Sequence, residues 1–484
     1  MTRPPRGARG GAARYPASCW PSSAVRVMVA MVSSFPGRIP LTTRSREAIF
    51  GPLFHSRGEP MAKRPHVSTP LTRRKFLGLA TVGAAAGTQE LAFPAVVRAQ
   101  EPIRIGQLIP FTGFLGAIGE YGKQGATLGV EELNEKGGVL GRKVELITED
   151  EANPGVAVQK ARKLIEKDRV VAIEGLVSSA SCLAVGDEVQ RAKVLMINAG
   201  ANSDEIRSKR CHRYVFSTEG CNTQYVSAIG GWLIRERKIS RWYFLTSDYA
   251  FGHDLLRVAR NLLTANKGTE VGSDLAPTGT TDFSQYITKM KAAKPDLVFH
   301  NLAGADVTNF LKQYAEAGMT LEVAGGVIDS AYAWPVGESL RGHFPIIWWH
   351  ELSTPQSQAW AARYIKRWGR PPDNQAYGDY VAVHAIAQAI EKAKSTDSAK
   401  LVQALEGHTL TGAMDGLKGR PLTFRAWDHQ LLQPMYVVAA RDKSKWRDKW
   451  DIFEIVSEVP PRAESLETIA IPKAESQCQL EPLA

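Results

Sequence analysis

From residue 103 onward, segments with strand character alternate with segments of helical periodicity. The strand segments are rich in β-branched and aromatic residues, as in IRIGQLI (103–109) and RWYFLTSD (241–248). The helical segments carry start and stop signals, such as Pro154 at the start of one and Gly137-Gly138 after another. This alternation predicts parallel sheets covered by helices on both faces.

The alternation restarts near residue 220, which predicts an α/β fold in two lobes, each with its own mostly parallel sheet. The chain that follows residue 99 is also longer than one hydrophobic core usually serves. Toward the C-terminus the pattern changes to consecutive helices, expected at about 355–369, 376–393 and 397–405. The stretch LTFRAWDHQLLQPMYVVAAR (422–441) then predicts two strands joined by a turn at Asp428-His429.

Residues 71–100, LTRRKFLGLATVGAAAGTQELAFPAVVRAQ, have the parts of an export signal. Arg73, Arg74 and Lys75 form a basic start, a short apolar run follows, and Ala99 ends a cleavage site before Gln100. The arginine pair followed by Phe-Leu resembles the twin-arginine export motif. We therefore expect residues 61–99 to be a twin-arginine-type signal peptide and the mature protein to be periplasmic. An ordinary secretion signal and a basic-ended amphipathic helix are the alternatives.

Residues 1–60 are rich in Arg, Pro, Ser and Gly and show neither helix nor strand periodicity. Because a signal peptide should be N-terminal, and because Met61 reads as a natural start, one interpretation is a mis-assigned translation start. The other interpretation is a genuine disordered extension.

The charge balance excludes one class of function. The formal net charge is +11, but residues 1–99 contribute +12, so the remaining chain is close to neutral. The basic composition is therefore a property of the leader, and nucleic acid is not expected as a partner.

The mature chain keeps Cys182, Cys211, Cys221 and Cys478, with no CxxC spacing that would indicate zinc binding or thioredoxin chemistry. An exported protein can form disulfides. Cys211 and Cys221 flank HRYVFSTEG, and a bridge between them is the preferred pairing, with buried free thiols as the alternative.

The sequence shows no catalytic signature. It has no P-loop, no GxSxG elbow and no HExxH motif, and the glycines at 113, 116, 119 and 122 do not form a dinucleotide fingerprint. The ten histidines lack metal-ligand spacing. We therefore expect a protein that is not an enzyme and that needs no cofactor or metal.

Candidate binding residues follow the predicted strands, where open α/β sheets bind ligands. Ser178 and Ser179 stand at a helix start, where free N–H groups and hydroxyls suit a carboxylate, although one of them can also be the N-cap. The loop NAGANS (198–203) allows close approach to the backbone. Tyr249 and Phe251 in SDYAFG offer an apolar wall, or else pack beneath their loop.

These segments resemble the periplasmic branched-chain amino acid-binding family, the Leu/Ile/Val-binding type I periplasmic binding proteins of ABC importers. The resemblance spans about 101–456 and rests on GLVSSAS, VLMINAGANS, TSDYAFG, TTDFSQYITKMKAAKPDLVF and above all NEKGGVLGRKVEL. It implies two lobes joined by three crossing strands that close on a small ligand. The implied boundaries are lobe 1 at 101–220 and 349–430, lobe 2 at 221–348 and 431–456, and a tail at 457–484.

The resemblance also implies roles for residues. Tyr121 matches a tyrosine that borders the ligand, and Ser178 matches the first hydroxyl that holds the ligand carboxylate. Gly200 and Asn202 match an Ala and a Thr that bind the carboxylate and the amino group, and Phe251 matches a tyrosine of the second lobe. The family's acid for the ammonium group falls near Val327, with Asp329 two residues away.

We expect a small carboxylate-bearing ligand, either branched-chain amino acid-like or an aromatic acid, another organic acid or an amide. The missing acid at Val327 favours a ligand without an ammonium group. The resemblance implies a monomeric binding protein that delivers its ligand to membrane permease subunits of an ABC importer. The same fold also serves in ligand-sensing accessory proteins of signalling receptors, which is the alternative function.

Overall fold

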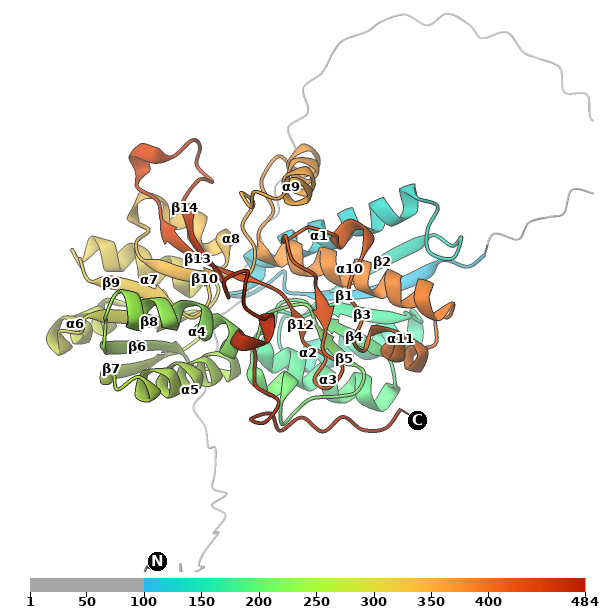
Figure 1. Ribbon diagram of the computed structural model, residues 1–484, viewed down its shortest axis with the longest axis horizontal. Coiled ribbons are helices and arrows are strands. Elements are labelled where there is room, and N and C mark those ends of the chain that lie inside the picture. The colour runs from blue at the N-terminus through green and yellow to red at the C-terminus, as the bar shows by residue number, and fades with distance from the viewer. Residues whose placement is uncertain (1–99, 484) are drawn as a thin grey trace, which may run out of the picture. The chain divides into compact units, whose positions relative to one another are not determined.

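The computed structural model describes residues 100–483 (Figure 1). The predicted extension (1–60) and export signal (61–99) lie outside the described residues. Within the described part of the chain, no helix combines the length and the apolar character needed to cross a membrane.

The first lobe is built on a five-stranded parallel sheet with the strand order β2-β1-β3-β4-β5. Its strands are β1 (Ile103–Ile109), β2 (Val144–Asp150), β3 (Ala172–Gly175), β4 (Leu195–Asn198) and β5 (Val215–Ser217). Its helices are α1 (Gly116–Glu135), α2 (Pro154–Arg162), α3 (Ser179–Ala192), α9 (Pro355–Trp368), α10 (Asn374–Ala393) and α11 (Ser398–Leu405).

Helices α1 and α10 cover one face of this sheet, and α2 and α3 cover the other. Successive side chains of a strand point to opposite faces, so each strand contributes to both cores. On β1, Ile105 packs into the same core cluster as α1 and α10, whereas Leu108 packs with α2 and α3. The spaced glycines of α1 allow α10 to approach closely. A Cβ at Gly125 would come within 2.0 Å of the Ala376 carbonyl oxygen, so the glycine pattern serves helix packing here.

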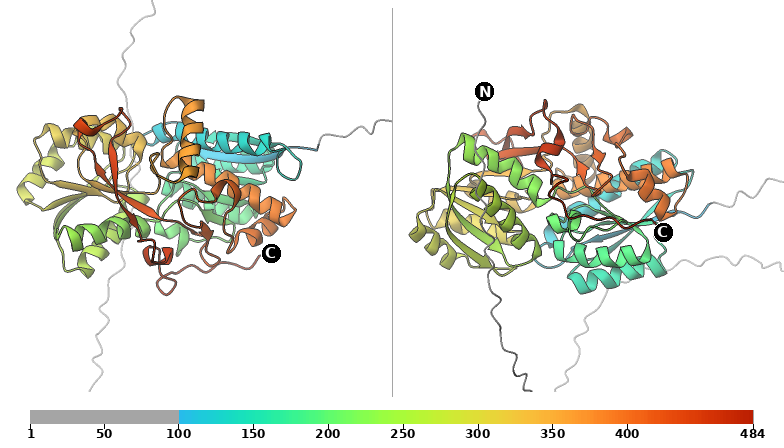
Figure 2. Two further views of the ribbon diagram at one scale, coloured as in Figure 1. Left: turned by 45° about the horizontal axis from the view of Figure 1, so that its top comes forward. Right: turned by 60° about the horizontal axis from the view of Figure 1, so that its bottom comes forward.

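The second lobe holds a seven-stranded sheet with the order β14-β13-β10-β9-β8-β6-β7. Its strands are β6 (Arg241–Ser247), β7 (Thr269–Ala276), β8 (Leu297–Asn301), β9 (Glu322–Gly325), β10 (His343–Ile346), β13 (Met435–Ala440) and β14 (Phe453–Val459). The first five are parallel, and β13 and β14 are antiparallel additions beside β10. Its helices are α4 (Asn222–Gly231), α5 (Ala250–Ala265), α6 (Ser284–Ala293), α7 (Ala305–Glu316) and α8 (Ser330–Ala333). The α/β fold in two lobes is therefore confirmed (Figure 2).

The predicted pair of strands near the C-terminus is three strands. A hairpin of β11 (Thr423–Phe424) and β12 (Leu431–Leu432) encloses the Asp428-His429 turn, as expected, but β13 then belongs to the sheet of the second lobe. Gln433-Pro434 separates β12 from β13. Proline cannot donate a ladder hydrogen bond, which explains why the second predicted strand divides at this position.

Within the described residues, three connections between strands and helices of the two lobes run side by side: residues 218–221 after β5, 347–354 after β10, and 433–434 before β13. The C-terminal segment after β14 crosses between the lobes a fourth time. The buried Lys418 holds two of the three connections together, because its Nζ donates to the backbone carbonyls of Ile347 and Pro434. The Gln433 amide donates to the carbonyl of Thr218 in the third connection and accepts from Lys418. One lysine and one glutamine therefore fix the three connections where they run side by side.

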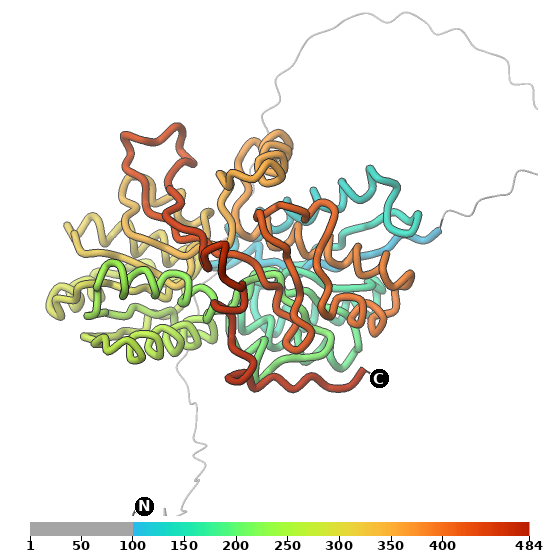
Figure 3. The backbone as a smooth tube through the Cα atoms, in the orientation of Figure 1, coloured from blue at the N-terminus to red at the C-terminus, as the bar shows by residue number. Residues whose placement is uncertain are grey.

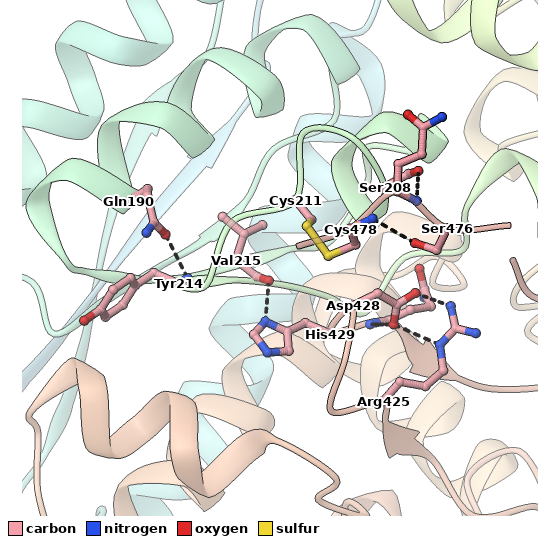
Figure 4. Close-up of a disulfide and its surroundings, with 12 residues drawn as sticks. Gln190, Ser208, Cys211, Tyr214, Val215, Arg425, Asp428, His429, Ser476 and Cys478 are labelled. Atoms are coloured by element: carbon pink, nitrogen blue, oxygen red, sulfur yellow. Dashed lines mark hydrogen bonds and ion pairs between the residues drawn. A yellow bond between two sulfur atoms is a disulfide. The ribbon is translucent and has the colours of Figure 1, made fainter. Parts of the chain in front are cut away.

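The C-terminal segment after β14 returns to the first lobe, as the red trace in Figure 3 shows. There Cys478 forms a disulfide with Cys211, with the Cα atoms 5.5 Å apart (Figure 4). The predicted Cys211–Cys221 pairing is wrong. These two residues lie before and after strand β5, and an extended strand keeps its ends too far apart for a bridge. Cys182 and Cys221 are buried free thiols, which was the alternative.

Candidate functional site

A small cavity lies between the lobes at the carboxyl ends of their parallel strands. The first lobe contributes Leu115, Val177, Gly200, Asn202, Asn374 and Gln375 to its lining. The connection after β5 contributes Glu219. The second lobe contributes Tyr225, Tyr249, Phe251, Leu302, Ala303, Val307, Val327 and Asp329.

Five of the predicted site residues line this cavity: Gly200, Asn202, Tyr249, Phe251 and Asp329. They come from the segments that follow β4, β6 and β9, and Phe251 lies in the first turn of α5. Residues 200 and 329 are more than a hundred positions apart in the sequence. The edge of each sheet where parallel strands end brings these segments together. Their contact with a ligand stays a prediction, but the structure does bring them to one place.

Ser178 and Ser179 are outside the lining, and their hydroxyl groups contact other protein groups. The Ser178 hydroxyl is the N-cap of α3 and accepts from the Ser181 N–H. The Ser179 hydroxyl accepts from the Ser203 N–H. The N–H groups of Val177 and Ser178 both donate to Glu151 Oε1, at 2.9 and 3.0 Å.

The carboxyl group of Glu151 therefore occupies the start of α3, where the sequence predicts the ligand carboxylate. Burial raises the pKa of Glu151 to about 8, because removing a carboxylate from water disfavours its charged form. The two N–H donors act in the opposite direction, since they stabilise the charge.

Tyr121 is also outside the lining. Its ring lies under the guanidinium group of Arg370, with 3.9 Å from the charged carbon to the ring centre, and beside the indole of Trp334. Burial raises the pKa of Tyr121 to about 12. Because Tyr121 belongs to the first lobe and Trp334 to the second, the tyrosine contributes to the contact between lobes.

Glu219 is a charged lining residue that was not predicted from the sequence. Its Oε1 accepts three hydrogen bonds: from the Tyr225 hydroxyl at 2.6 Å, the Gly220 N–H at 2.7 Å and the Asn202 amide at 3.1 Å. Burial raises the pKa of Glu219 to about 7, although the hydrogen bonds from Tyr225 and Gly220 lower it. The available signal was its position directly after a strand, the same criterion that selected Ser178.

Asp329 brings a second carboxyl group into the cavity from the second lobe. Its Oδ1 accepts a 2.6 Å hydrogen bond from the amide of Asn374 in the first lobe. Burial raises the pKa of Asp329 to about 6, and the Asn374 bond partly offsets this. Val327 lines the cavity without an acid, as the sequence indicates, and Asp329, two residues on, lines it too. The expectation of a ligand without an ammonium group stays a prediction.

Aromatic side chains form the apolar part of the cavity and join the lobes. The rings of Tyr249 and Phe251 lie 5.7 Å apart, and Phe114 of the first lobe packs edge-on against Tyr249 at the same distance. The Ala305 N–H donates to the Phe114 carbonyl at 2.9 Å, which is a backbone hydrogen bond between lobes. The structure therefore has its lobes in contact around the cavity.

Metal binding finds no support in the described residues, because no group of three or more His, Cys, Asp or Glu side chains is arranged to hold an ion.

Comparisons with known proteins agree with this geometry. A family model described as periplasmic binding protein matches residues 102–445. A Leu/Ile/Val-binding protein of Rhizobium johnstonii is 28% identical over 315 residues, which cover 64% of this chain and 84% of that protein.

Solved structures extend the comparison. A periplasmic binding protein of Burkholderia mallei has a TM-score of 0.72 at 23% identity, covering 78% of this chain and 98% of that one. An ABC transporter solute-binding protein of Rhodopseudomonas palustris, solved with 3,4-dihydroxybenzoic acid, has a TM-score of 0.67 at 25% identity, covering 74% of this chain and 97% of that one.

Proposed function

The chain belongs to the periplasmic binding protein family, in its branched-chain amino acid-binding group, and from that premise we propose that it is the substrate-binding protein of an ABC importer. It would capture a small organic molecule between its lobes and deliver it to permease subunits in the membrane. The named relatives support small-ligand binding, since one is a Leu/Ile/Val-binding protein and another was solved with an aromatic acid.

The observation that carries the proposal is a cavity lined by both lobes and by the connection between them. A ligand there contacts Asn202 of the first lobe and Phe251 of the second only when the lobes are closed. Because those contacts exist in one state only, ligand binding shifts the equilibrium toward closure. A permease can then distinguish the loaded protein from the empty one by its shape.

The test has two steps on the mature protein, residues 100–484. A thermal-shift screen of amino acids, organic acids, amides and amines should find at least one compound that stabilises the fold. Small-angle scattering should then show the radius of gyration falling when that compound saturates the protein. A ligand that binds without any compaction would contradict the closure mechanism, and a screen without a single ligand would contradict the function.

Delivery to a permease is tested in cells. Removing the protein should abolish uptake of the radiolabelled ligand found in the screen, and expression from a plasmid should restore it. Unchanged uptake without the protein, together with a lost transcriptional or behavioural response to the ligand, would assign the chain to ligand sensing instead.

The family places its members in the periplasm, and we propose that export removes the leader before Gln100. N-terminal sequencing of the exported protein should then begin at Gln100. Replacing Arg73 and Arg74 by lysine should leave precursor in the cytoplasm, as twin-arginine recognition requires. Exported protein that still carries residues 1–60 would contradict this processing.

A further inference from the structure

The charges that line the cavity have one sign. Glu219 and Asp329 both line it, and the residues of the lining include no Lys, Arg or His. Glu219 Oε1 takes all three hydrogen bonds described above, and no hydrogen bond to Oε2 occurs among the described residues. A negative group on the ligand would face two buried carboxyl groups, which is an unfavourable arrangement in a site shielded from water.

The place that would bind a ligand carboxylate is already filled. At the start of α3, the N–H groups of Val177 and Ser178 hold the side chain of Glu151, which is itself buried. A second carboxylate at the same N–H groups would have to displace Glu151 and leave that residue buried without donors. This helix start therefore offers no free anion site.

The side-chain amides of the lining direct their N–H donors at protein acceptors. Asn202 donates to Glu219 and to the Gly220 carbonyl, and Asn374 donates to Asp329. Gln375 donates to Asp379 and to the Ala199 carbonyl. Asn202 and Gln375 thus have both amide N–H donors engaged, and Asn374 has one of its two engaged. The cavity also presents carboxyl acceptors to a ligand, so the best-matched polar group is one that donates.

We propose that the ligand is an apolar primary amine without a carboxylate group, whose ammonium lies between Glu219 and Asp329. An ammonium group has three donors and one positive charge, which suits two carboxylates from different lobes. The proposal rests on the proposed function, since it names the ligand class of the same cavity. Phe251, Leu302 and Val307 would surround the apolar body.

The charged groups that face Glu219 fit this assignment. Arg207 lies behind the loop, where its guanidinium donates to the backbone carbonyls of Ala201, Ser203 and Glu219 rather than to the carboxyl group. Its charge, like that of a bound ammonium group, favours the ionised form of Glu219, whereas Asp329 disfavours it. A cationic ligand would therefore relieve the repulsion between the two acids.

Calorimetry on matched compounds tests the ligand class. The series 3-methylbutylamine, leucinamide, leucine and 4-methylpentanoate shares one apolar body and differs only in its charged groups, and a second series replaces the body by a phenyl ring. The amine and the amide should bind at least tenfold more tightly than the acid and the amino acid. Equal or tighter binding of either carboxylate-bearing compound would overturn the proposal.

The outcomes separate this proposal from the proposed function. If an acid binds and compacts the protein, the binding function stands and the amine assignment falls. If no compound from the full screen binds, the binding function falls and the amine assignment falls with it.

Two variants locate the ammonium. Glu219→Gln and Asp329→Asn keep the shape of each side chain and remove its charge, so each should weaken binding of the preferred amine at least tenfold. The exposed acid Glu316 on α7 provides the control, and Glu316→Gln should bind as the parent does. Wild-type binding should also strengthen between pH 5.5 and pH 8 as the two acids ionise. Unchanged affinity in both site variants, or affinity that falls with rising pH, would overturn the proposal.

Discussion

Replacing Glu174 by glutamine should make the protein more stable at neutral and alkaline pH. Glu174 lies on β3, fully buried beside Asp379 of α10. The amides of Gln107 and Gln375 both donate to Asp379, whereas neither oxygen of Glu174 has a hydrogen-bond partner among the described residues. Two carboxyl groups in contact are most stable when they share one proton, and Asp379 is the partner better supplied with donors.

The sign and size of the effect follow from the pKa. Burial and the neighbouring Asp379 hold the pKa of Glu174 well above its usual 4.5, and burial raises the pKa of Asp379 to about 6. The unfolded chain therefore releases these protons first as the pH rises. A carboxyl group whose pKa is raised in the folded protein stabilises the fold fully at pH values below its pKa in the unfolded chain. That contribution to the free energy of unfolding declines as the pH rises toward the pKa in the folded protein, by about 1.4 kcal/mol per pH unit for each proton.

Glutamine at position 174 can donate to Asp379 as the protonated acid does, but it does not titrate. The free energy of unfolding of Glu174→Gln relative to the parent should thus increase by about 1.4 kcal/mol per pH unit, or about 2.7 kcal/mol between pH 6 and pH 8. Urea denaturation followed by tryptophan fluorescence at pH 5, 6, 7 and 8 measures the difference. The exposed Glu166 supplies the control variant Glu166→Gln. Parallel curves for Glu174→Gln and the parent would refute the reasoning.

Three further predictions concern the disulfide, the connections and the cavity. Replacing Cys211 and Cys478 together by serine should lower the free energy of unfolding by up to about 5–6 kcal/mol, the chain-entropy value for the 267-residue separation, and unchanged urea denaturation would contradict it. Lys418→Met should cost about 2–5 kcal/mol because it leaves buried carbonyl acceptors without a donor; a melting temperature equal to that of the parent would show that the lysine does not hold the connections. Phe251→Ala should speed ligand release at least tenfold, about 1.4 kcal/mol, in stopped-flow dissociation, and an unchanged rate would exclude Phe251 from the closed cavity.

The local elements of the fold could be predicted from the sequence because their signals are local. The first strand, 103–109, has the bounds expected from its apolar run, and α2 begins at Pro154 as the helix-start signal indicates. β10 and β14 were not predicted, although β14 is rich in β-branched residues. Each is defined by its pairing with β13, and pairing between distant segments leaves little trace in either segment alone.

The residues of the candidate site could likewise be predicted only in part. Gly200, Asn202, Tyr249, Phe251 and Asp329 follow strand ends and line the cavity, as the general rule for open sheets predicts. Ser178 also follows a strand end, yet its N–H donates to Glu151. These residues are 27 positions apart, so no local sequence pattern predicts their contact. Whether a group at a strand end faces a ligand or a neighbouring side chain depends on the side chains packed around it.

The disulfide has a consequence for how the molecule is made. Cys211 and Cys478 are 267 residues apart, so the bond cannot close until synthesis has passed residue 478. The other thiols of the described chain, Cys182 and Cys221, are buried, and burial raises the pKa of both, to about 12 for Cys182. Thiolates are the reactive form, so a chain that folds before it meets an oxidant presents one usable pair. Folding first and oxidising second would therefore prevent mispairing among the described cysteines without any need for a disulfide isomerase.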